Sequence, residues 1–243
     1  MLGDNFISFN HNNFISASKK SHLAPSRSSY APSMRFYNPS AFQIEDLSEL
    51  VGFIEKNPLA TVITSRGGET FVSHLPFVPH LEGGKITLNS HFSKSNPHLD
   101  ICHEVPDVYL VFHGVSSGIT PTLYSAVGVP TWNYSTVHLK GSIRFLVGSD
   151  SDLALEVMTR HFEDKRSSSF TSTSTDPYVV SMKRGIEVVE VEVSEIEGKF
   201  KLSQNRPVED RLAVAKYLAK SSDLQDQRTS LEMMRVNNLN IEE

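Results

Sequence analysis

The chain has 243 residues, of which 39% are hydrophobic and 21% are charged, and its formal net charge is −5. This is the composition of an ordinary globular protein, and it excludes a chain that is disordered throughout and a coiled-coil rod. The negative net charge also argues against a globally basic nucleic-acid-binding protein.

Cysteine and histidine usage narrow the class further. The one cysteine, Cys102, can form no internal disulfide, and no paired-cysteine spacing suits a structural zinc ion. Ten histidines occur in the chain, but no His-Glu-x-x-His motif or carboxylate cluster accompanies them. No apolar run approaches the ~20 residues that a membrane-spanning helix needs. We therefore expect a soluble, cytoplasmic protein without a bound metal and without a membrane partner.

Residues 1–33 differ in composition from the rest of the chain. They contain eight serines and four asparagines and carry a net charge of +2, against −7 for the remainder. Such a segment cannot bury enough apolar surface to offset the entropy of ordering it. We interpret 1–33 as a disordered extension and 34–243 as one folded domain. A transit peptide, a solvated tail and a true start at Met34 all stay open, and with them an organellar or nuclear location.

The first half of the folded part predicts one helix followed by strands. Apolar residues recur at helical spacing over 44–55, and Asn57-Pro58 ends that run. Glycine-containing turns separate the β-rich stretches that come next, which predicts an antiparallel meander. These strands are predicted over 59–65, 69–75 and 85–91, with turns at 66–68 and 82–84.

The second half continues this mixture of strands and helices. Strands are predicted over 107–113, 134–147 and 185–196, and helices over 151–165, 207–220 and near 231–236. The Ser/Thr run 167–175 predicts a mobile loop. Many short strands with helices around them indicate an α+β fold with a closed or split β-barrel. A parallel doubly wound sheet is disfavoured because several connections are only a few residues long.

Several common catalytic and nucleotide-binding motifs are absent. There is no Gly-x-Ser-x-Gly elbow for a serine nucleophile. The pairs Gly67-Gly68 and Gly83-Gly84 suit hairpin turns rather than a phosphate cradle, because neither opens a helix after a strand. Cys102 is interpreted as a small buried hydrophobic residue without a catalytic role.

Three polar segments remain as candidates. Residues 90–97 follow a strand and open a short helix, so hydroxyls, a lysine and backbone N–H groups lie where a phosphate is readily held; a plain capped helix is the alternative. Residues 130–134 combine a tryptophan, an amide and a phenol, which suits an aromatic heterocycle; a core tryptophan is the alternative. Residues 199–206 place polar groups between a strand and a helix, and a solvated loop explains them equally well.

Taken in order, five segments resemble the PaiB-type FMN-binding family. Its members are described as negative transcriptional regulators and have a flavin-binding split barrel similar to that of pyridoxamine 5′-phosphate oxidase. The similarity covers nearly all of the chain from Met34 onward. The matching segments are 34–39 with Phe42, 73–77, 91–97, 130–134 with Val137-His138 and Gly141, and 197–206.

The resemblance implies an FMN held at a homodimer interface, with both subunits contributing to each site. Lys94, with Ser93 and His91 and in the same segment as Asn96, would contact the phosphate, because a dianion needs a cation and several donors. The remaining positions are the backbone of Ser73, His74 and Leu75 along the isoalloxazine edge, Thr131, Trp132 and Asn133 from the partner subunit, and Lys201, Ser203 and Gln204, which would close the site.

Three functions from different classes follow. The first is a flavin-binding transcriptional regulator, although direct DNA contact is disfavoured because residues 34–243 carry −7. The second is a flavin-dependent oxidoreductase acting on an unidentified small molecule. The third is a dimeric interaction module that has lost FMN, against which the retention of Lys94, Trp132, Asn133 and Gln204 argues.

Overall fold

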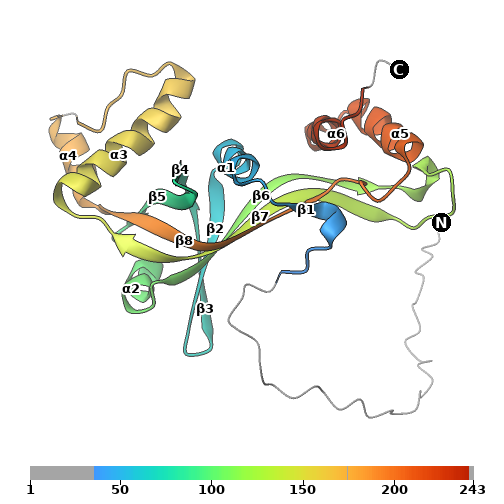
Figure 1. Cartoon of the computed structure of the whole chain (residues 1–243). Coiled ribbons are helices and arrows are strands. Elements are labelled where there is room, and N and C mark those ends of the chain that lie inside the picture. The colour runs from blue at the N-terminus through green and yellow to red at the C-terminus, as the bar shows by residue number, and fades with distance from the viewer. Residues whose placement is uncertain (1–35, 174, 241–243) are drawn as a thin grey trace, which may run out of the picture. The chain divides into compact units, whose positions relative to one another are not determined.

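The computed structural model describes residues 36–173 and 175–240 (Figure 1). Its strands are β1 (Gln43–Ile44), β2 (Leu59–Arg66), β3 (Glu69–Pro76), β4 (Val78–Glu82), β5 (Lys85–Ser93), β6 (Asp107–Ile119), β7 (Thr131–Phe145) and β8 (Ile186–Lys201). Its α-helices are α1 (Leu47–Lys56), α2 (Pro97–Glu104), α3 (Gly148–Glu163), α4 (Pro177–Arg184), α5 (Val208–Ala219) and α6 (Leu224–Asn237). The predicted disordered extension, 1–33, lies outside the described residues.

All strands belong to one antiparallel sheet with the order β3-β2-β6-β7-β8-β5-β4, and β1 pairs with β8. Two tight hairpins join β2 to β3 and β4 to β5. Their four glycines, at 67, 68, 83 and 84, have positive φ angles between 56° and 89°, as two-residue hairpin turns favour. The predicted continuous meander is wrong, because β3 does not pair with β4. Instead β8 is long enough to pair with both β7 and β5, and β6, β7 and β8 lie between the two hairpins in the sheet.

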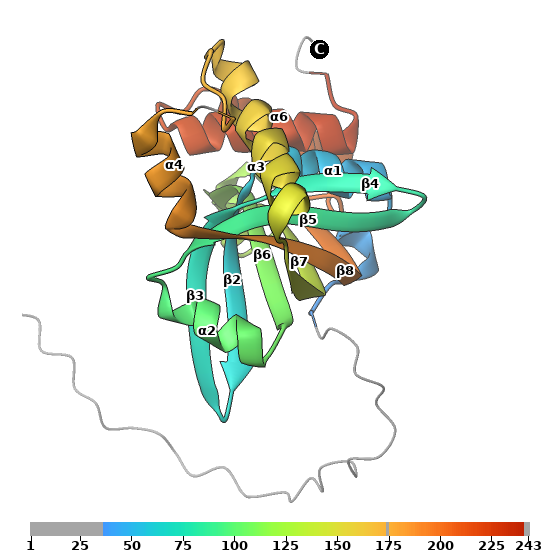
Figure 2. The same ribbon diagram turned by 90° about the vertical axis from the view of Figure 1, so that its left-hand side faces the viewer.

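Three long strands, β6, β7 and β8, form a ribbon that extends beyond the barrel. Figure 1 shows α5 and α6 over one end of this ribbon and α3 and α4 at the other end. Figure 2 shows α1, α3 and α6 on one side of the sheet and α2 away from them. Side chains that alternate inward along the strands form the core with α1, α5 and α6. Fully buried examples are Phe77, Phe92, Phe112, Phe200, Leu110 and Leu139.

The observed helices differ from the predicted ones mainly at their ends. α1 begins at Leu47, because Ile44 pairs with Gly198 in the sheet and Asp46 caps the helix by accepting a hydrogen bond from the Glu49 N–H at 2.8 Å. α6 begins at Leu224 rather than near Leu231. The sequence pattern missed its first turns because they carry few apolar residues. α4 and β4 were not predicted.

The Ser/Thr run 167–173 contains no helix or strand. Two of its residues, Thr171 and Ser172, are hydrogen-bonded to α3. Glu156 accepts hydrogen bonds from the Thr171 hydroxyl at 3.0 Å and the Ser172 hydroxyl at 2.6 Å. These bonds and the neighbouring Arg160 lower the pKa of Glu156 to about 2. Part of the predicted loop is therefore anchored by a carboxylate that stays ionised.

These observations confirm an α+β fold with an antiparallel split barrel and peripheral helices. Cys102 is buried, as predicted. Within the described residues, none of the helices has both the length and the apolar character needed to cross a lipid bilayer.

Gly141 lies at a register shift between β7 and β8, where a side chain does not fit. A Cβ there would lie 2.5 Å from the Glu192 carbonyl oxygen, which is backbone and cannot easily move. We expect Gly141→Ala to lower the free energy of unfolding by about 1–3 kcal/mol in chemical denaturation. The control is Gly52→Ala in α1, where a Cβ meets nothing within 4 Å, and it should be neutral or stabilising. Equal losses from both variants would contradict this packing argument.

Candidate functional site

The predicted phosphate segment connects β5 to α2. Asn96 caps α2, and its Oδ1 accepts a hydrogen bond from the His98 N–H at 3.0 Å. Lys94 is exposed, and no ion pair to its ammonium group occurs within the described residues. His91 is half-buried on β5, and burial lowers its pKa, which favours the neutral imidazole.

The backbone N–H groups of this segment are already used. The Lys94 N–H donates to the Gly185 carbonyl at 2.9 Å, and the Asn96 N–H donates to the Ser93 carbonyl at 2.9 Å. Pro97, the first residue of α2, has no N–H. The expectation that backbone N–H groups would hold a phosphate is therefore wrong for this conformation. The Lys94 ammonium group remains as a donor, together with one hydroxyl of the hydrogen-bonded pair Ser93 and Ser95.

Ser73 links this segment to β3. Its Oγ lies 3.0 Å from Asn96 Nδ2 and 2.9 Å from His98 Nδ1. Both Ser73 and His98 are buried, and burial lowers the pKa of His98, which favours the neutral imidazole. His98 Nε2 is buried without a hydrogen-bond partner in the described part of the chain. The side chain of Ser73 thus positions Asn96 rather than facing open surface.

The other two predicted residues of β3 differ in exposure. His74 is exposed, whereas Leu75 is half-buried against the core. Among the described residues, β3 pairs only with β2, so it is an edge strand of the sheet. An edge strand presents backbone groups that a ligand can reach. The geometry thus agrees with backbone, rather than side-chain, contacts from residues 73–75.

A second cluster forms where β7 begins and β8 ends. Lys201 Nζ donates to Thr131 Oγ1 at 2.7 Å and to the Trp132 carbonyl at 2.6 Å. Asn133 Nδ2 donates to Ser203 Oγ at 2.9 Å, and both side chains are buried. The interpretation of 199–206 as a solvated loop is wrong, because this segment is bonded to the start of β7.

Gln204 stabilises the turn that follows β8. Its Oε1 accepts a hydrogen bond from the Leu202 N–H at 2.7 Å, and its Nε2 donates to the Phe200 carbonyl. Ser203 has a positive φ of 68°, a conformation that is rare for residues other than glycine. Gln204 therefore stabilises a strained turn. Lys201, which directly precedes this turn, contacts Thr131.

Trp132 is not part of the core. Its side chain is 56% exposed, and its ring packs beside Gly118. The interpretation of a core tryptophan is therefore wrong. Burial, with the nearby charges of Lys199 and Arg206, lowers the pKa of Lys201, which marks this end of the ribbon as cation-rich. An exposed aromatic ring beside several cations suits an anionic, aromatic ligand.

β8 separates the two clusters. The Lys94 N–H is hydrogen-bonded to Gly185, which directly precedes β8, and Lys201 is the last residue of β8. Because a strand rises about 3.3 Å per residue, the 16 residues of β8 span up to about 50 Å. This is much longer than an FMN molecule. The two clusters of one chain therefore do not form a single site.

A further group of titratable side chains lies along the ribbon on the same face as Lys201. Tyr109 Oη lies 2.6 Å from His138 Nδ1, and Phe36 stacks on the imidazole with ring centroids 3.9 Å apart. Burial, followed by the charges of His113 and Lys199, lowers the pKa of His138 to about 4. His138 was a landmark of the family resemblance, but the sequence suggested no partner for it.

Two other contacts were missed because they join residues far apart in the chain. His98 meets Ser73, 25 positions away, and Met233 of α6 accepts a hydrogen bond from Asn133, 100 positions away. Within 36–173 and 175–240, no group of three or more His, Cys, Asp or Glu residues could hold a metal ion.

Residues 36–195 match the family model described as "Putative FMN-binding domain". The chain belongs to this family. It is 28% identical to Protease synthase and sporulation protein PAI 2 of Bacillus subtilis over 183 residues, which cover 75% of this chain and 88% of that protein. It is also 28% identical to an uncharacterized protein of Emericella nidulans over 208 residues, covering 68% and 83%. The resemblance to PaiB-type proteins is confirmed.

Solved structures share the fold at low sequence identity. The FAD and heme binding protein from Mycobacterium smegmatis has a TM-score of 0.54 and 15% identity, covering 70% of this chain and 78% of that one. A putative 5-nitroimidazole antibiotic resistance protein from Bacteroides thetaiotaomicron has a TM-score of 0.50 and 19% identity, covering 65% and 85%. At these identities the likeness concerns the fold alone.

His138 makes stability depend on pH. Its pKa in the folded protein is about 4, below the ordinary value of 6.5, so its contribution is complete above pH 6.5 and is lost as the pH falls from 6.5 toward 4. We expect His138→Gln to reduce the drop in melting temperature between about pH 7 and 4. Parallel losses in the variant and the parent would show that other groups account for the acid sensitivity.

Proposed function

We propose that the protein binds FMN as a homodimer, in which each site combines residues 91–96 of one protomer with residues 131–133 of its partner. The observation that carries this proposal is the separation of the two clusters by up to about 50 Å along β8. A two-fold symmetric pair of chains gives each site one cluster from each protomer. The dimer then holds two equivalent sites.

The chemistry of the first cluster fits the phosphate group. A phosphate monoester carries close to two negative charges at neutral pH and needs a cation with several donors. Lys94 supplies an exposed ammonium group, and the Ser93 hydroxyl lies next to it. The neutral His91 and the amide of Asn96 flank them, and Ser73 holds Asn96 in place.

The second cluster fits the flavin ring. Trp132 is exposed, and an aromatic ring is a favourable surface for an offset stack or an edge contact. Lys201 ties Thr131 and Trp132 to the end of β8, while Asn133 and Ser203 hold the same strands from inside. When bound, FMN supplies electron or hydride transfer. The residues of this chain bind the cofactor and orient it.

An exposed apolar surface supports the dimer. Leu59 of β2 and Val72 of β3 are both exposed, and the register places them on the outer face of the sheet. Thr61 and His74 lie between them on this face, so the two apolar side chains are separate contact points that a partner chain could cover. Val72 lies on the same strand, β3, that contributes residues 73–75 to the proposed site.

We further propose that the FMN-loaded dimer acts in regulation without contacting DNA directly. The name of the Bacillus subtilis relative, Protease synthase and sporulation protein PAI 2, supports a regulatory role. The charge of −7 on residues 34–243 opposes binding to the phosphate backbone of DNA. The second candidate, a flavin-dependent oxidoreductase, needs no contact with DNA either.

Mixed dimers test the shared site. Lys94→Ala and Trp132→Ala homodimers should each lose FMN affinity, by roughly 10- to 150-fold for Lys94→Ala, since a hydrogen bond to a charged group is lost. A mixed dimer of the two variants contains one site with both residues intact. We expect flavin absorbance after desalting to return to about half of the parent value, because one of two sites is restored.

The matched control mixes Lys94→Ala with Ser93→Ala. These residues belong to the same cluster, so both sites of the mixed dimer are damaged and flavin should not return. Light scattering after size-exclusion chromatography should report two chains per particle. Equal recovery in both mixtures, or none in either, would refute the shared site.

The regulator and the oxidoreductase are distinguished by their reactions. An oxidoreductase should oxidise a reduced nicotinamide or reduce oxygen with multiple turnovers of bound FMN, whereas a regulator should show at most one reduction per flavin. DNA retention that falls steeply as salt rises would contradict our proposal of regulation without DNA contact.

A further inference from the structure

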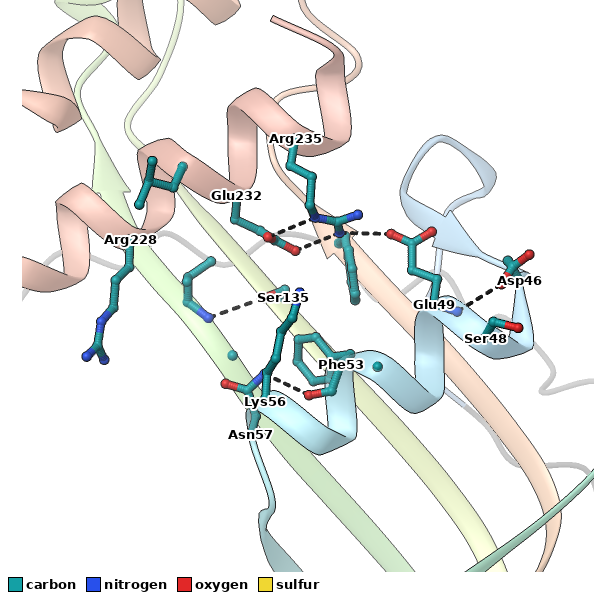
Figure 3. Close-up of a pocket in the computed structure, with 15 residues that line it drawn as sticks. Asp46, Ser48, Glu49, Phe53, Lys56, Asn57, Ser135, Arg228, Glu232 and Arg235 are labelled. Atoms are coloured by element: carbon teal, nitrogen blue, oxygen red, sulfur yellow. Dashed lines mark hydrogen bonds and ion pairs between the residues drawn. The ribbon is translucent and has the colours of Figure 1, made fainter. Parts of the chain in front are cut away.

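A cleft of about 750 Å³ lies between α1 and α6, separate from the two clusters described above (Figure 3). Its floor comes from β6, β7 and β8, including Ser135 and Phe200. Phe200 faces the core, whereas the next residue, Lys201, faces the opposite side of the strand. The cleft therefore lies on the inner face of the ribbon. Its volume is within the range of small-molecule sites.

Two glycines shape this space. Gly52 lies in the middle of α1, where glycine weakens a helix relative to alanine, and a Cβ there would meet nothing within 4 Å. Gly114 lies in the floor, where β6 shifts its register between His113 and Ser116. A Cβ on Gly114 would lie 2.6 Å from the Phe53 ring. The wall formed by α1 therefore leaves open space beside Gly52. The floor contains a β-bulge, a feature that is often found next to binding sites.

The two ends of the cleft differ in charge. At one end, Arg235 of α6 binds Glu232 and Glu49 at 2.8 Å each, and this ion-pair bridge joins α6 to α1. Toward the other end, Figure 3 shows Lys56 and Arg228 extending from the two helices into the gap. Within the described residues, neither of these cations forms an ion pair. Glu49 and Glu232 are thus used at the bridge, the third acid of the cleft, Asp46, caps α1, and two cations remain for a ligand.

The surface between the two ends is largely apolar. Phe53 and Phe200 pack with ring centroids 5.1 Å apart, and Leu231 projects from α6 with its side chain exposed. Ser135 Oγ accepts a hydrogen bond from the Val115 N–H at 3.2 Å, so its hydroxyl hydrogen is available to another acceptor. Aromatic and aliphatic walls with a few polar groups are typical of sites for flat organic molecules.

We infer that this cleft binds a small organic anion with a flat apolar body, such as an aromatic carboxylate or sulfonate. The anionic group lies between Lys56 and Arg228, and the apolar body lies on Phe53 and Leu231. This site is distinct from the proposed FMN site and does not depend on it. It adjoins the second cluster through α6, because Met233 of that helix accepts a hydrogen bond from Asn133.

The test uses 8-anilinonaphthalene-1-sulfonate as the probe and isothermal titration calorimetry of the full chain. We expect one probe per chain, with an affinity unchanged by saturating FMN. Gly52→Met fills the cleft and should lower the affinity at least about tenfold, because the apolar body is excluded. Its melting temperature should not fall, because methionine favours a helix more than glycine does. Gly52→Ala, with a much smaller side chain, is the matched control and should keep most of the binding.

A second pair of variants tests the charges. Lys56→Gln combined with Arg228→Gln should weaken the probe at least about tenfold, as expected when hydrogen bonds to a charged group are lost. Lys216→Gln combined with Lys220→Gln removes two cations of α5 and its end that do not line the cleft, and binding should persist. Displacement of the probe by FMN, full binding by Gly52→Met, or equal losses from the two double variants would overturn the inference.

Discussion

The pairing of β7 with β8 is the constraint on which the rest of the molecule depends. It runs from Tyr134 opposite Lys201 to Phe145 opposite Val189. At one end, β8 also pairs with β5 and completes the barrel, while at the other end it reaches α5 and α6. Because a strand is extended, this single pairing holds the two predicted halves of the site far apart in one chain. The proposed site shared between two chains reconciles this distance with one small cofactor.

The far end of the ribbon is held by buried polar groups as well as by apolar packing. Asn133 bonds to Ser203, and Ser117 of β6 bonds to Thr229 of α6 at 2.8 Å. Buried polar groups cost free energy when they lack a hydrogen-bond partner. These bonds therefore fix the position of α6 on the strands. The same helix then forms one wall of the cleft opposite α1. The second cluster and the cleft are therefore two faces of one packed unit.

Lys199 shows how a cation is kept at this end of the sheet. Its side chain is buried, and Nζ donates to the Tyr37 carbonyl at 2.7 Å and lies 4.8 Å from the Tyr37 ring centroid. Carbonyl and ring contacts stabilise the ammonium group in place of a carboxylate. The charge remains effective nearby, and it helps to lower the pKa values of His138 and Lys201. Residues 36–38 thus cover the outer face of the ribbon and contribute to its electrostatics.

The sequence by itself determined the local elements and the family. The paired glycines at 67–68 and 83–84 predicted both hairpins, because few other residues adopt positive φ, and Asn96 with Pro97 predicted the start of α2. Only the tertiary structure decided that β5 pairs with β8, that Trp132 is exposed, and that an open cleft lies between α1 and α6. Turns and caps depend on neighbouring residues, whereas pairing partners, exposure and clefts depend on residues far apart in the chain, which no local pattern specifies.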